Sequence, residues 1–425
     1  MKKFLKKWLC VVLAMFFCFL FGCTVSPSNS ASGQEGKLNQ LEIPSGFTRV
    51  TSAKDLDNIR NNSSGNYILT KDVDLSSWGN WEPINITGVF DGNGFSIKGV
   101  SMQYSDTGLA YWGIFGEVEG NGVVKNLSLI DTSIDIITHP DKHCGIVGGI
   151  VGYLGEDAVI ENCSFSGNIK VISYQTAWVG GIVGEALGII RNSSNAGTIS
   201  AISDQYGVTV GGISGHGGTI VDCYNAGTLA SNETIGGIVG NGGYESIDNS
   251  IVRCYNTGEI TVSTAYSAKC GGIVGYWQTR KEARIEDCYN IGFINISAQS
   301  SIAIGGIAGQ LFNVSIMRCY NVGEMDIEEF SSQIRPSIGG IVGSAYCQRS
   351  SPKPVIEECY YVNSISSVGD IGGTGSWEYT ITNITSFGTH EMRYQETFVG
   401  FDFDTIWGID TTTNGGYPYL KNTRT

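Results

Sequence analysis

The chain has 425 residues, with 40 acidic and 26 basic side chains, so its formal net charge is −14. Nucleic acid and anionic membrane surfaces repel such an acidic protein, so we expect no nucleic-acid partner. The hydrophobic fraction of 41% is large enough to build a core and argues against a disordered chain.

Residues 1–22 are predicted to be a lipoprotein signal peptide. The basic start MKKFLKKW precedes an apolar run over residues 9–21 that is too short to span a membrane comfortably. The run ends in LFGC, which resembles the lipobox of bacterial lipoproteins. That resemblance implies that the thiol of Cys23 carries acyl chains such as palmitate and anchors the protein to the membrane at the cell surface. An ordinary secretory leader is the alternative.

Residues 23–44 are rich in Ser, Asn and Gly and are predicted to form a flexible tether. We interpret residues 45–87 as an N-terminal α/β cap. Ser52 and Asp55 resemble a capping box, and Leu56 and Ile59 would face a core from a short helix. A strand over residues 67–75 is expected to follow.

Residues 88–371 contain a repeat with two conserved-looking parts. The first part, GGIVG or a near copy, begins at Gly148, Gly180, Gly211, Gly236, Gly271, Gly305 and Gly339. The second part, I-x-x-C-Y-N-x-G-x-I, has its Cys at Cys163, Cys223, Cys254, Cys288, Cys319 and Cys359, with Ser193 in the second unit. Aliphatic residues recur in fixed columns around both parts, as they do when equivalent positions stack in space. With two weaker units at Gly88 and Gly113, the pattern predicts an all-β parallel solenoid of about nine coils.

The positions around the Cys predict local geometry. The Ile three residues before it has the wrong parity to share its face, so a bend or bulge must lie between them. The residue directly before the Cys alternates between acid and base, as stacked neighbours on an outer face would. These residues are Asp222, Arg253, Asp287, Arg318 and Glu358.

The unit GGIVG…NCYNxGxI resembles the GLUG motif of bacterial surface proteins. Segments 67–84 and 401–420 also resemble sequences that flank such repeats, and the likeness covers roughly residues 47–425. The resemblance implies a right-handed parallel β-helix. The family occurs in adhesin-like proteins and beside the catalytic part of immunoglobulin A metallopeptidases. After the repeats, residues 372–425 are rich in aromatic residues, and we interpret them as a C-terminal cap over the open end of the solenoid.

The Cys residues are spaced about 30 residues apart, unlike the close pairs of zinc sites, and we expect a buried column of thiols. Cys144, Cys270 and Cys347 lie outside this column, and the sequence does not pair them. His139, Asp141, His143 and Cys144 cluster in one loop, which is either a metal site or, as we favour, an exposed polar loop. No metal or cofactor is expected.

Catalysis is not expected. A zinc metallopeptidase needs HExxH, and the one His-Glu pair, His390-Glu391, lacks the second His. A carbohydrate-active β-helix would need clustered carboxylates. The acids on the early coils that would have to converge are Asp91, Asp131, Asp135 and Glu156.

Two further columns are candidates for recognition or packing. The possible ligand face is formed by Tyr224, Tyr255, Tyr289, Tyr320 and Tyr360, whose rings either meet sugar rings or pack under loops. The Asn column is expected to form hydrogen bonds along the stack and consists of Asn195, Asn225, Asn256, Asn290 and Asn321.

The leading functional hypothesis is a monomeric, non-catalytic adhesin that binds a glycan or a host protein. A carbohydrate-active enzyme and a purely structural spacer are the alternatives. The loops between repeats differ most at Asn241–Asn249, Tyr276–Arg284 and Ser344–Pro354, and insertions on one side of a solenoid often mark its binding face.

Overall fold

The structure is a computed structural model. It describes residues 43–107, 111–138, 145–203, 207–243, 249–264, 267–298, 302–328, 336–347, 353–363, 369–374 and 379–423. The predicted signal peptide, Cys23 and the loop with His139, Asp141, His143 and Cys144 lie outside the described residues.

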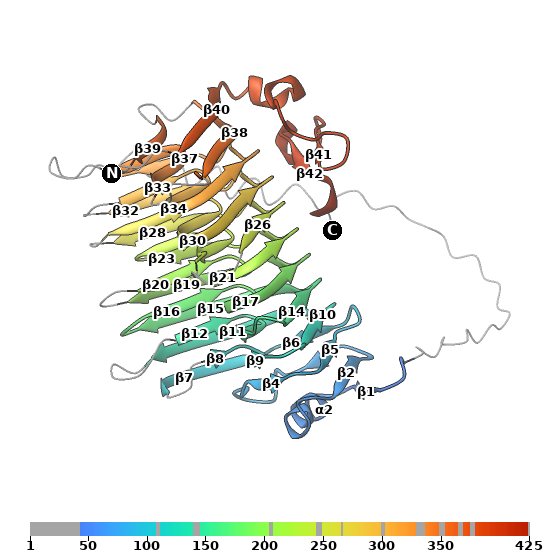
Figure 1. Ribbon diagram of the computed structural model, residues 1–425. Coiled ribbons are helices and arrows are strands. Elements are labelled where there is room, and N and C mark those ends of the chain that lie inside the picture. The colour runs from blue at the N-terminus through green and yellow to red at the C-terminus, as the bar shows by residue number, and fades with distance from the viewer. Residues whose placement is uncertain are drawn as a thin grey trace, which may run out of the picture. The chain divides into compact units, whose positions relative to one another are not determined.

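The repeats form a parallel β-solenoid of about eight turns, in which each coil lies on the one before it (Figure 1). One set of strands precedes or contains the GG motif. This set consists of β8 (Tyr111–Trp112), β12 (Gly145–Gly148), β16 (Ala177–Gly180), β20 (Val208–Gly211), β24 (Thr234–Gly236), β29 (Ala268–Gly271), β33 (Ile302–Gly305), β37 (Ser337–Tyr346) and β39 (Gly369–Thr374). About nine coils were expected from the sequence, and no described strand of an earlier coil pairs with β8, so this ladder begins at β8.

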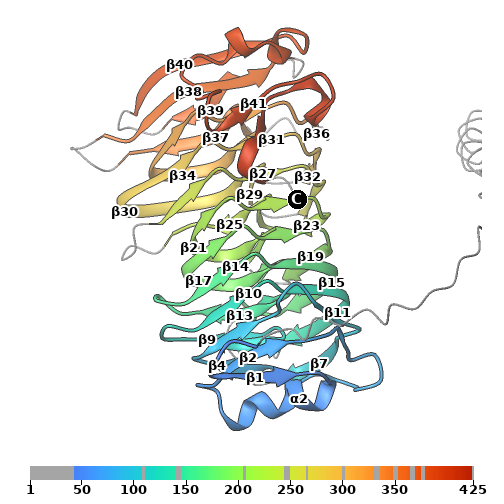
Figure 2. The same cartoon turned by 90° about the vertical axis from the view of Figure 1, so that its right-hand side faces the viewer.

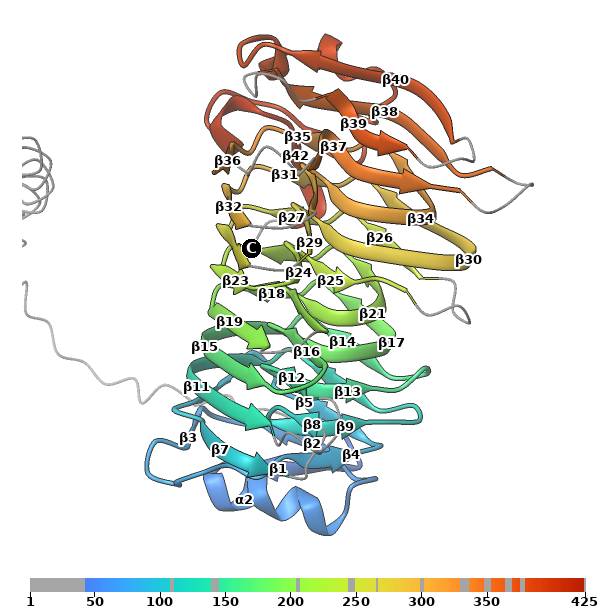
Figure 3. The ribbon, with the colours of Figure 1, turned by 90° about the vertical axis from the view of Figure 1, so that its left-hand side faces the viewer.

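A second set of strands follows the GG motif and leads to the Ile before the Cys. It consists of β4 (Ile84–Ile86), β5 (Val89–Asp91), β9 (Phe115–Val118), β10 (Val123–Lys125), β13 (Val151–Leu154), β14 (Val159–Glu161), β17 (Val183–Arg191), β21 (Ser214–Val221), β25 (Val239–Asn241), β26 (Ser250–Val252), β30 (Val274–Glu286), β34 (Ala308–Met317), β38 (Val355–Val362) and β40 (Thr380–Phe387). Figures 2 and 3 show these ladders from two further sides.

A third set begins near the Cys and completes the coil. It consists of β6 (Ser96–Lys98), β7 (Ser101–Thr107), β11 (Ser128–Thr138), β15 (Ser164–Ser173), β18 (Ser194–Asn195), β19 (Thr198–Ser203), β22 (Tyr224–Asn225), β23 (Leu229–Ser231), β27 (Tyr255–Asn256), β28 (Ile260–Thr264), β31 (Tyr289–Asn290), β32 (Ile294–Ala298), β35 (Tyr320–Asn321) and β36 (Met325–Ile327). Parallel ladders to the coils above and below satisfy the backbone groups of all three sets.

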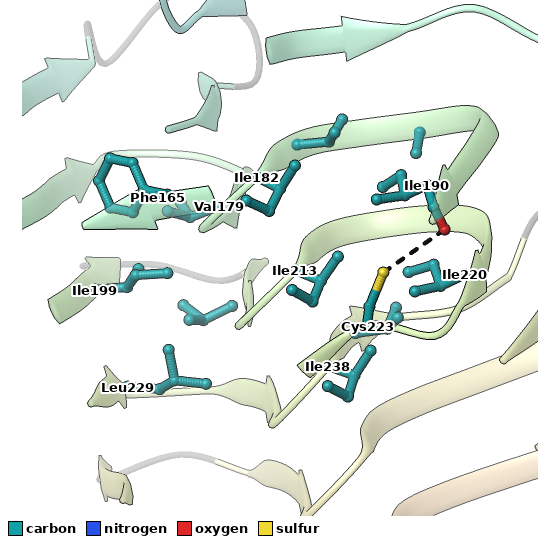
Figure 4. Packing of buried hydrophobic residues seen from close by; sticks show 14 of the residues in the cluster. Phe165, Val179, Ile182, Ile190, Ile199, Ile213, Ile220, Cys223, Leu229 and Ile238 are labelled. Carbon is teal, nitrogen blue, oxygen red and sulfur yellow. Dashed lines mark hydrogen bonds between the residues drawn. The ribbon is translucent and has the colours of Figure 1, made fainter. Parts of the chain in front are cut away.

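The aliphatic columns stack as the sequence predicts. Ile220 pairs in register with Ile251, and Ile251 pairs with Ile285 in the next coil. All three side chains are fully buried. Figure 4 shows two such columns in neighbouring coils, with Ile182 above Ile213 and Ile190 above Ile220. Each buried aliphatic side chain contributes roughly 1.5–3 kcal/mol of stabilising free energy against the loss of chain entropy. Every coil therefore adds a similar amount of stability to the core.

The bend predicted before the Cys is a single residue in the left-handed region. Asp222 has φ 55°, and the equivalent Arg253 and Asp287 both have φ 52°. Because this residue reverses the alternation of side chains, Ile220 and Cys223 both point into the core although they are three positions apart in the sequence. The alternating charges pair as expected, with Arg253 bound to Asp222 at 2.7 Å and Arg318 bound to Asp287 at 2.9 Å.

The second Gly of GGIVG and the Asn column depend on each other. A Cβ on Gly237 would lie 2.7 Å from the Cβ of Asn256 and 2.0 Å from the carbonyl oxygen of Gly272, so only Gly fits there. The Asn side chains form a continuous buried ladder, in which Asn225 donates to Asn256 at 2.7 Å and Asn256 donates to Asn290 at 2.8 Å. The prediction of an Asn ladder is confirmed.

The N-terminal segment closes one end of the stack, where Figure 3 shows the helix α2 beneath the first strands. It consists of β1 (Phe47–Val50), α2 (Ala53–Asp57), the 3-10 helix η1 (Asn58–Asn61), β2 (Asn66–Leu69) and β3 (Val73–Asp74). The backbone N–H of Asp55 donates to Ser52 Oγ at 3.1 Å, which is the predicted cap, and Leu56 and Ile59 are fully buried.

The C-terminal segment differs from the expected cap over residues 372–425. Residues 369–387 still belong to the solenoid, because β39 pairs with β37 and β40 pairs with β38. Residues 388–423 then turn back along the side of the stack, as Figures 1 and 2 show. This part contains η2 (Glu391–Arg393), η3 (Gln395–Thr397), β41 (Trp407–Gly408), η4 (Asn414–Gly416), β42 (Tyr419–Leu420) and η5 (Lys421–Thr423).

Candidate functional site

The predicted ligand face is a ladder of stacked rings, and most of it is covered. Successive rings from Tyr224 to Tyr320 have centroids 5.0, 4.8 and 5.1 Å apart and are parallel within 4°. Tyr289, Tyr320 and Tyr360 are 3%, 0% and 3% exposed, so these three cannot form an open face, and only Tyr224 and Tyr255 remain half-buried. Because each inner ring lies between two others, its faces are also closed to a sugar ring.

The cover over the tyrosine ladder is the C-terminal segment. Trp407 is fully buried, its ring lies 6.0 Å from Tyr289 and 5.9 Å from Tyr320, and its Nε1 donates to Asp287 Oδ1 at 3.2 Å. The hydroxyl of Tyr320 donates to the carbonyl of Pro418, and burial raises the pKa of Tyr320, which keeps this donor neutral. The aromatic residues of the C-terminus therefore pack on a side of the solenoid and do not cap its end.

The thiol column is buried and contains no disulfide bond among its described residues. All eight described Cys residues are buried, and each of the six thiols of the column donates to a backbone carbonyl, as Cys288 does to Glu286 at 3.2 Å. Burial raises the pKa of Cys163 to about 12, so its reactive thiolate form is disfavoured. Cys270 and Cys347, which the sequence did not pair, are both buried.

The carboxylates considered for catalysis lie on different parts of the coil. Asp91 on β5 forms an ion pair with Lys125 at 3.4 Å and accepts from Asn126 at 3.0 Å. Asp131 and Asp135 lie on β11, and Glu156 lies in the turn between β13 and β14. Over the described ranges, no group of three or more His, Cys, Asp or Glu side chains is arranged to hold a metal ion.

The described ends of the three variable loops meet in a groove of about 460 Å³ that crosses four coils. Its lining comprises Asn249, Ser250, Glu282, Ala283, Arg284, Asn313, Ser315, Met317, Lys353, Pro354 and Val355. The volume lies within the range of small-molecule sites. The prediction that these loops mark one side of the solenoid thus identifies the candidate site, although the Tyr face does not.

Unequal loop lengths create the groove. Gln278 pairs with Phe312 and Ala283 pairs with Val314, so β30 has four residues where β34 has only Asn313. Asn313 closes this tight corner with φ 60° and donates to the carbonyl of Thr279 at 2.7 Å. The short coil lies between two coils with longer loops and forms the floor of the groove.

Arg284 is the central charged side chain of the groove. In register it lies between Ser250 on one side and Ser315 on the other, so small neighbours leave space around its guanidinium. Its Nε contacts Glu286 Oε2 at 2.9 Å, which fixes the direction of the side chain, while 55% of the side chain stays exposed. Such a half-exposed, oriented Arg is suited to bind a planar anion such as a carboxylate.

Asn249 provides a buried acceptor at the edge of the same groove. It is 2% exposed, and its Nδ2 donates to the carbonyl of Gly242 at 3.1 Å. Its Oδ1 is buried and accepts no hydrogen bond from the described part of the chain. An unsatisfied buried acceptor costs roughly 1–3 kcal/mol, and a ligand hydroxyl in the groove would satisfy it.

A second groove of about 510 Å³ lies between β40 and the turn that follows it. It is lined by Tyr360, Asn383, Thr385, Phe387, Glu391, Tyr394, Glu396, Thr397 and Val399. His390 and Glu391 both make hydrogen bonds to residues close in sequence. The His390 ring contacts the hydroxyl of Tyr394 at 2.6 Å, and Glu391 accepts from the N–H of Gly388 at 2.8 Å. These bonds account for both side chains without a ligand, so we favour the first groove.

Sequence reasoning identified the walls of the groove but missed its floor. Arg284 and Lys353 lie in loops that the repeat spacing marked as variable. Asn313 and Ser315 were not marked, because their coil has no insertion. The short corner of this coil could have predicted the floor, because a short corner between two longer ones leaves a groove.

Comparisons with known proteins agree with the repeat pattern. Residues 143–170 match the family model of the GLUG motif. A protein of Evansella cellulosilytica, provisionally described as a Gly-rich membrane protein, is 30% identical over 173 residues, which are 38% of this chain and 18% of that protein. Halomucin of Haloquadratum walsbyi is 34% identical over 112 residues, 24% of this chain and 1% of halomucin. The matched part of this chain thus spans less than a fifth of either relative.

Among solved structures, a protein of Bacteroides ovatus provisionally described as an immunoglobulin A1 protease is similar over 89% of this chain and 92% of that chain, with a TM-score of 0.46 and 17% identity. Within the part of this chain that the structure describes, no helix has the length and hydropathy needed to cross a membrane. The matched motif and the stacked GG, Cys and Asn columns show that this chain contains GLUG-type repeats that fold as a β-solenoid.

Proposed function

We propose that this protein is a lipid-anchored cell-surface protein that binds an extracellular ligand, without catalysis, in the groove centred on Arg284. The observation that carries the proposal is that the described ends of the three most variable loops line one groove. A solenoid core is built from nearly identical coils, so a site that recognises a ligand is expected where the coils differ.

The proposed location rests on the leader and on the relatives. The lipobox-like LFGC at residues 20–23 supports acylation of Cys23. One relative is described as a membrane protein and another carries the name halomucin, which supports an extracytoplasmic role. If Cys23 carries the anchor, Cys23→Ser releases the protein from the membrane fraction and abolishes incorporation of labelled palmitate. Retention of both would refute the anchor.

The absence of catalysis in the proposal is supported by the charges of the groove. Glycosidases use two carboxylates on either side of the scissile bond. Glu282 is the one acidic side chain among the described lining residues, and its neighbours Arg284 and Lys353 are basic. Asp91, the earlier candidate, is already held by Lys125 and Asn126.

Arrays of glycans and extracellular matrix proteins, probed with the full acylated chain in detergent, test the proposal. Ser250→Trp places a large ring in the groove, and Ser200→Trp places the same ring on β19, outside it. We expect a ligand that binds the native protein and the Ser200→Trp variant but not the Ser250→Trp variant. Binding that Ser250→Trp does not affect would refute the groove as the site, and binding of nothing would favour a structural spacer. Released reducing ends or unsaturated products would establish the enzyme alternative.

A further inference from the structure

The groove differs in charge from the rest of the molecule. The whole chain has 26 basic and 40 acidic residues, whereas the described lining of the groove has two basic side chains, Arg284 and Lys353, and one acidic side chain, Glu282. On the loop of β30, Arg280 and Lys281 are exposed next to the groove wall. A basic site on an acidic solenoid attracts anions locally, while the remaining surface repels them.

The lining also offers hydroxyl and apolar recognition. The buried Oδ1 of Asn249 needs a hydrogen-bond donor, which a carboxylate or phosphate alone does not provide. Met317, Pro354 and Val355 add apolar surface to the same groove. A sugar ring has hydroxyl donors at its edge and C–H groups on its faces, so it matches both features.

On the basis of the proposed function, we propose that the ligand of this groove is an acidic glycan, in which the carboxylate of a hexuronic acid binds Arg284. The ion pair with Glu286 uses Nε of Arg284 at 2.9 Å, and among the described residues this is the one ion pair that Arg284 makes. Arg284 lines the groove, and its two terminal amino groups can bind a carboxylate there in a bidentate manner. Lys353, which also lines the groove, adds a second positive charge, and Asn249 accepts from a ring hydroxyl.

Oligogalacturonate and its fully methyl-esterified form make a matched pair of probes, because they share the backbone and differ in charge. Titration of the full chain is expected to show binding of the acid at least tenfold tighter than of the ester. Salt is expected to weaken binding of the acid, because screening acts on exposed charges. Equal affinity for both probes would overturn the acidic-glycan inference and leave the proposed function intact.

Arg284→Gln removes the charge from the groove, and Arg191→Gln is its control. Arg191 is exposed by 47% and pairs with Glu161 at 3.1 Å, much as Arg284 pairs with Glu286, but it lies outside the groove lining. We expect Arg284→Gln to lose at least tenfold in affinity for oligogalacturonate, Arg284→Lys to lose less, and Arg191→Gln to change it by less than twofold.

Two outcomes distinguish a failure of the acidic-glycan inference from a failure of the proposed function. Equal losses in Arg284→Gln and Arg191→Gln would overturn the groove as the glycan site and, with it, the proposed function. Binding of poly-glutamate or of a matrix protein that depends on Arg284, without binding of oligogalacturonate, would overturn the glycan inference and keep the proposed function. Native-like hydrogen exchange of the amides of β30 in each variant confirms that the fold is retained.

Discussion

Asn256→Ala tests how much the buried amide ladder stabilises the solenoid. The side chain of Asn256 is fully buried and makes four hydrogen bonds. It donates to the carbonyl of Gly258 at 3.0 Å and to Asn290 Oδ1 at 2.8 Å. It accepts from Asn225 Nδ2 at 2.7 Å and from the N–H of Gly258 at 3.2 Å. All four bonds are lost in the Ala variant.

The loss of stability follows from the groups left without partners. Asn225 Nδ2 keeps a bond to the carbonyl of Gly227 at 3.0 Å, and Asn290 Oδ1 keeps a bond from the N–H of Gly292 at 3.2 Å. The N–H and C=O of Gly258 lose the hydrogen bonds that they make to Asn256. Each unsatisfied buried group costs roughly 1–3 kcal/mol, so we expect a total loss of about 4 kcal/mol.

Native-state hydrogen exchange is the suitable assay, because a repeat protein need not unfold in a single step. The exchange of amides in β22, β27 and β31 reports the free energy of opening around Asn256. Thr257→Ala is the control, since Thr257 is exposed and its hydroxyl donates weakly to the Asn225 carbonyl at 3.3 Å, and we expect a change below about 0.5 kcal/mol. A similarly small change for Asn256→Ala would refute a stabilising role of the ladder.

Two further predictions concern the C-terminal segment and a buried His. Trp407→Ala removes the fully buried ring that covers the Tyr ladder, and such truncations cost about 3–5 kcal/mol of stability. We expect proteolysis after residue 388 and faster hydrogen exchange at β31 and β35. Trp78→Ala, which removes a ring that is 38% exposed, is expected to leave both unchanged. Burial lowers the pKa of His216 to about 4, below its usual value near 6.5. The unfolded chain therefore binds a proton first as pH falls, and we expect about 3 kcal/mol of stability to be lost between pH 6.5 and 4 in urea titrations of the native protein, but not of His216→Gln. A stability that instead rises as pH falls would show that Glu185, which pairs in register with His216 from the preceding coil, keeps the imidazole ring charged.

The coil itself was predictable because its determinants are local and repeated. The parity of Ile220 and Cys223 required a bend between them, and the structure places that bend at Asp222. The stacking of like residues followed from the columns, since one repeat contacts only its neighbours. The sequence columns therefore predict the contacts by which one coil stacks on the next.

The tyrosine face could not be predicted in the same way, because its cover comes from a distant part of the chain. Tyr320 and Trp407 are 87 residues apart in sequence, and nothing in the repeat shows that the aromatic C-terminus turns back along the side of the stack. The apolar rings alone fit both an open ligand face and a packed one. Because residues 388–423 bury Tyr289, Tyr320 and Tyr360, this part of the ladder is a packed surface and not an open ligand face.

The groove shows how a repetitive fold acquires a specific site without losing its core. The corner of β30 is three residues longer than that of β34, yet Ile285 and Ile316 return to register directly after it. Because lengthening a surface loop adds little closure entropy, such changes alter the walls of the groove at low cost to the stack. The aliphatic columns are constrained by burial in every coil, whereas the corner next to Arg284 is free to vary in length and charge. Recognition is therefore expected at this corner, where neighbouring coils differ, and stability in the columns, where they agree.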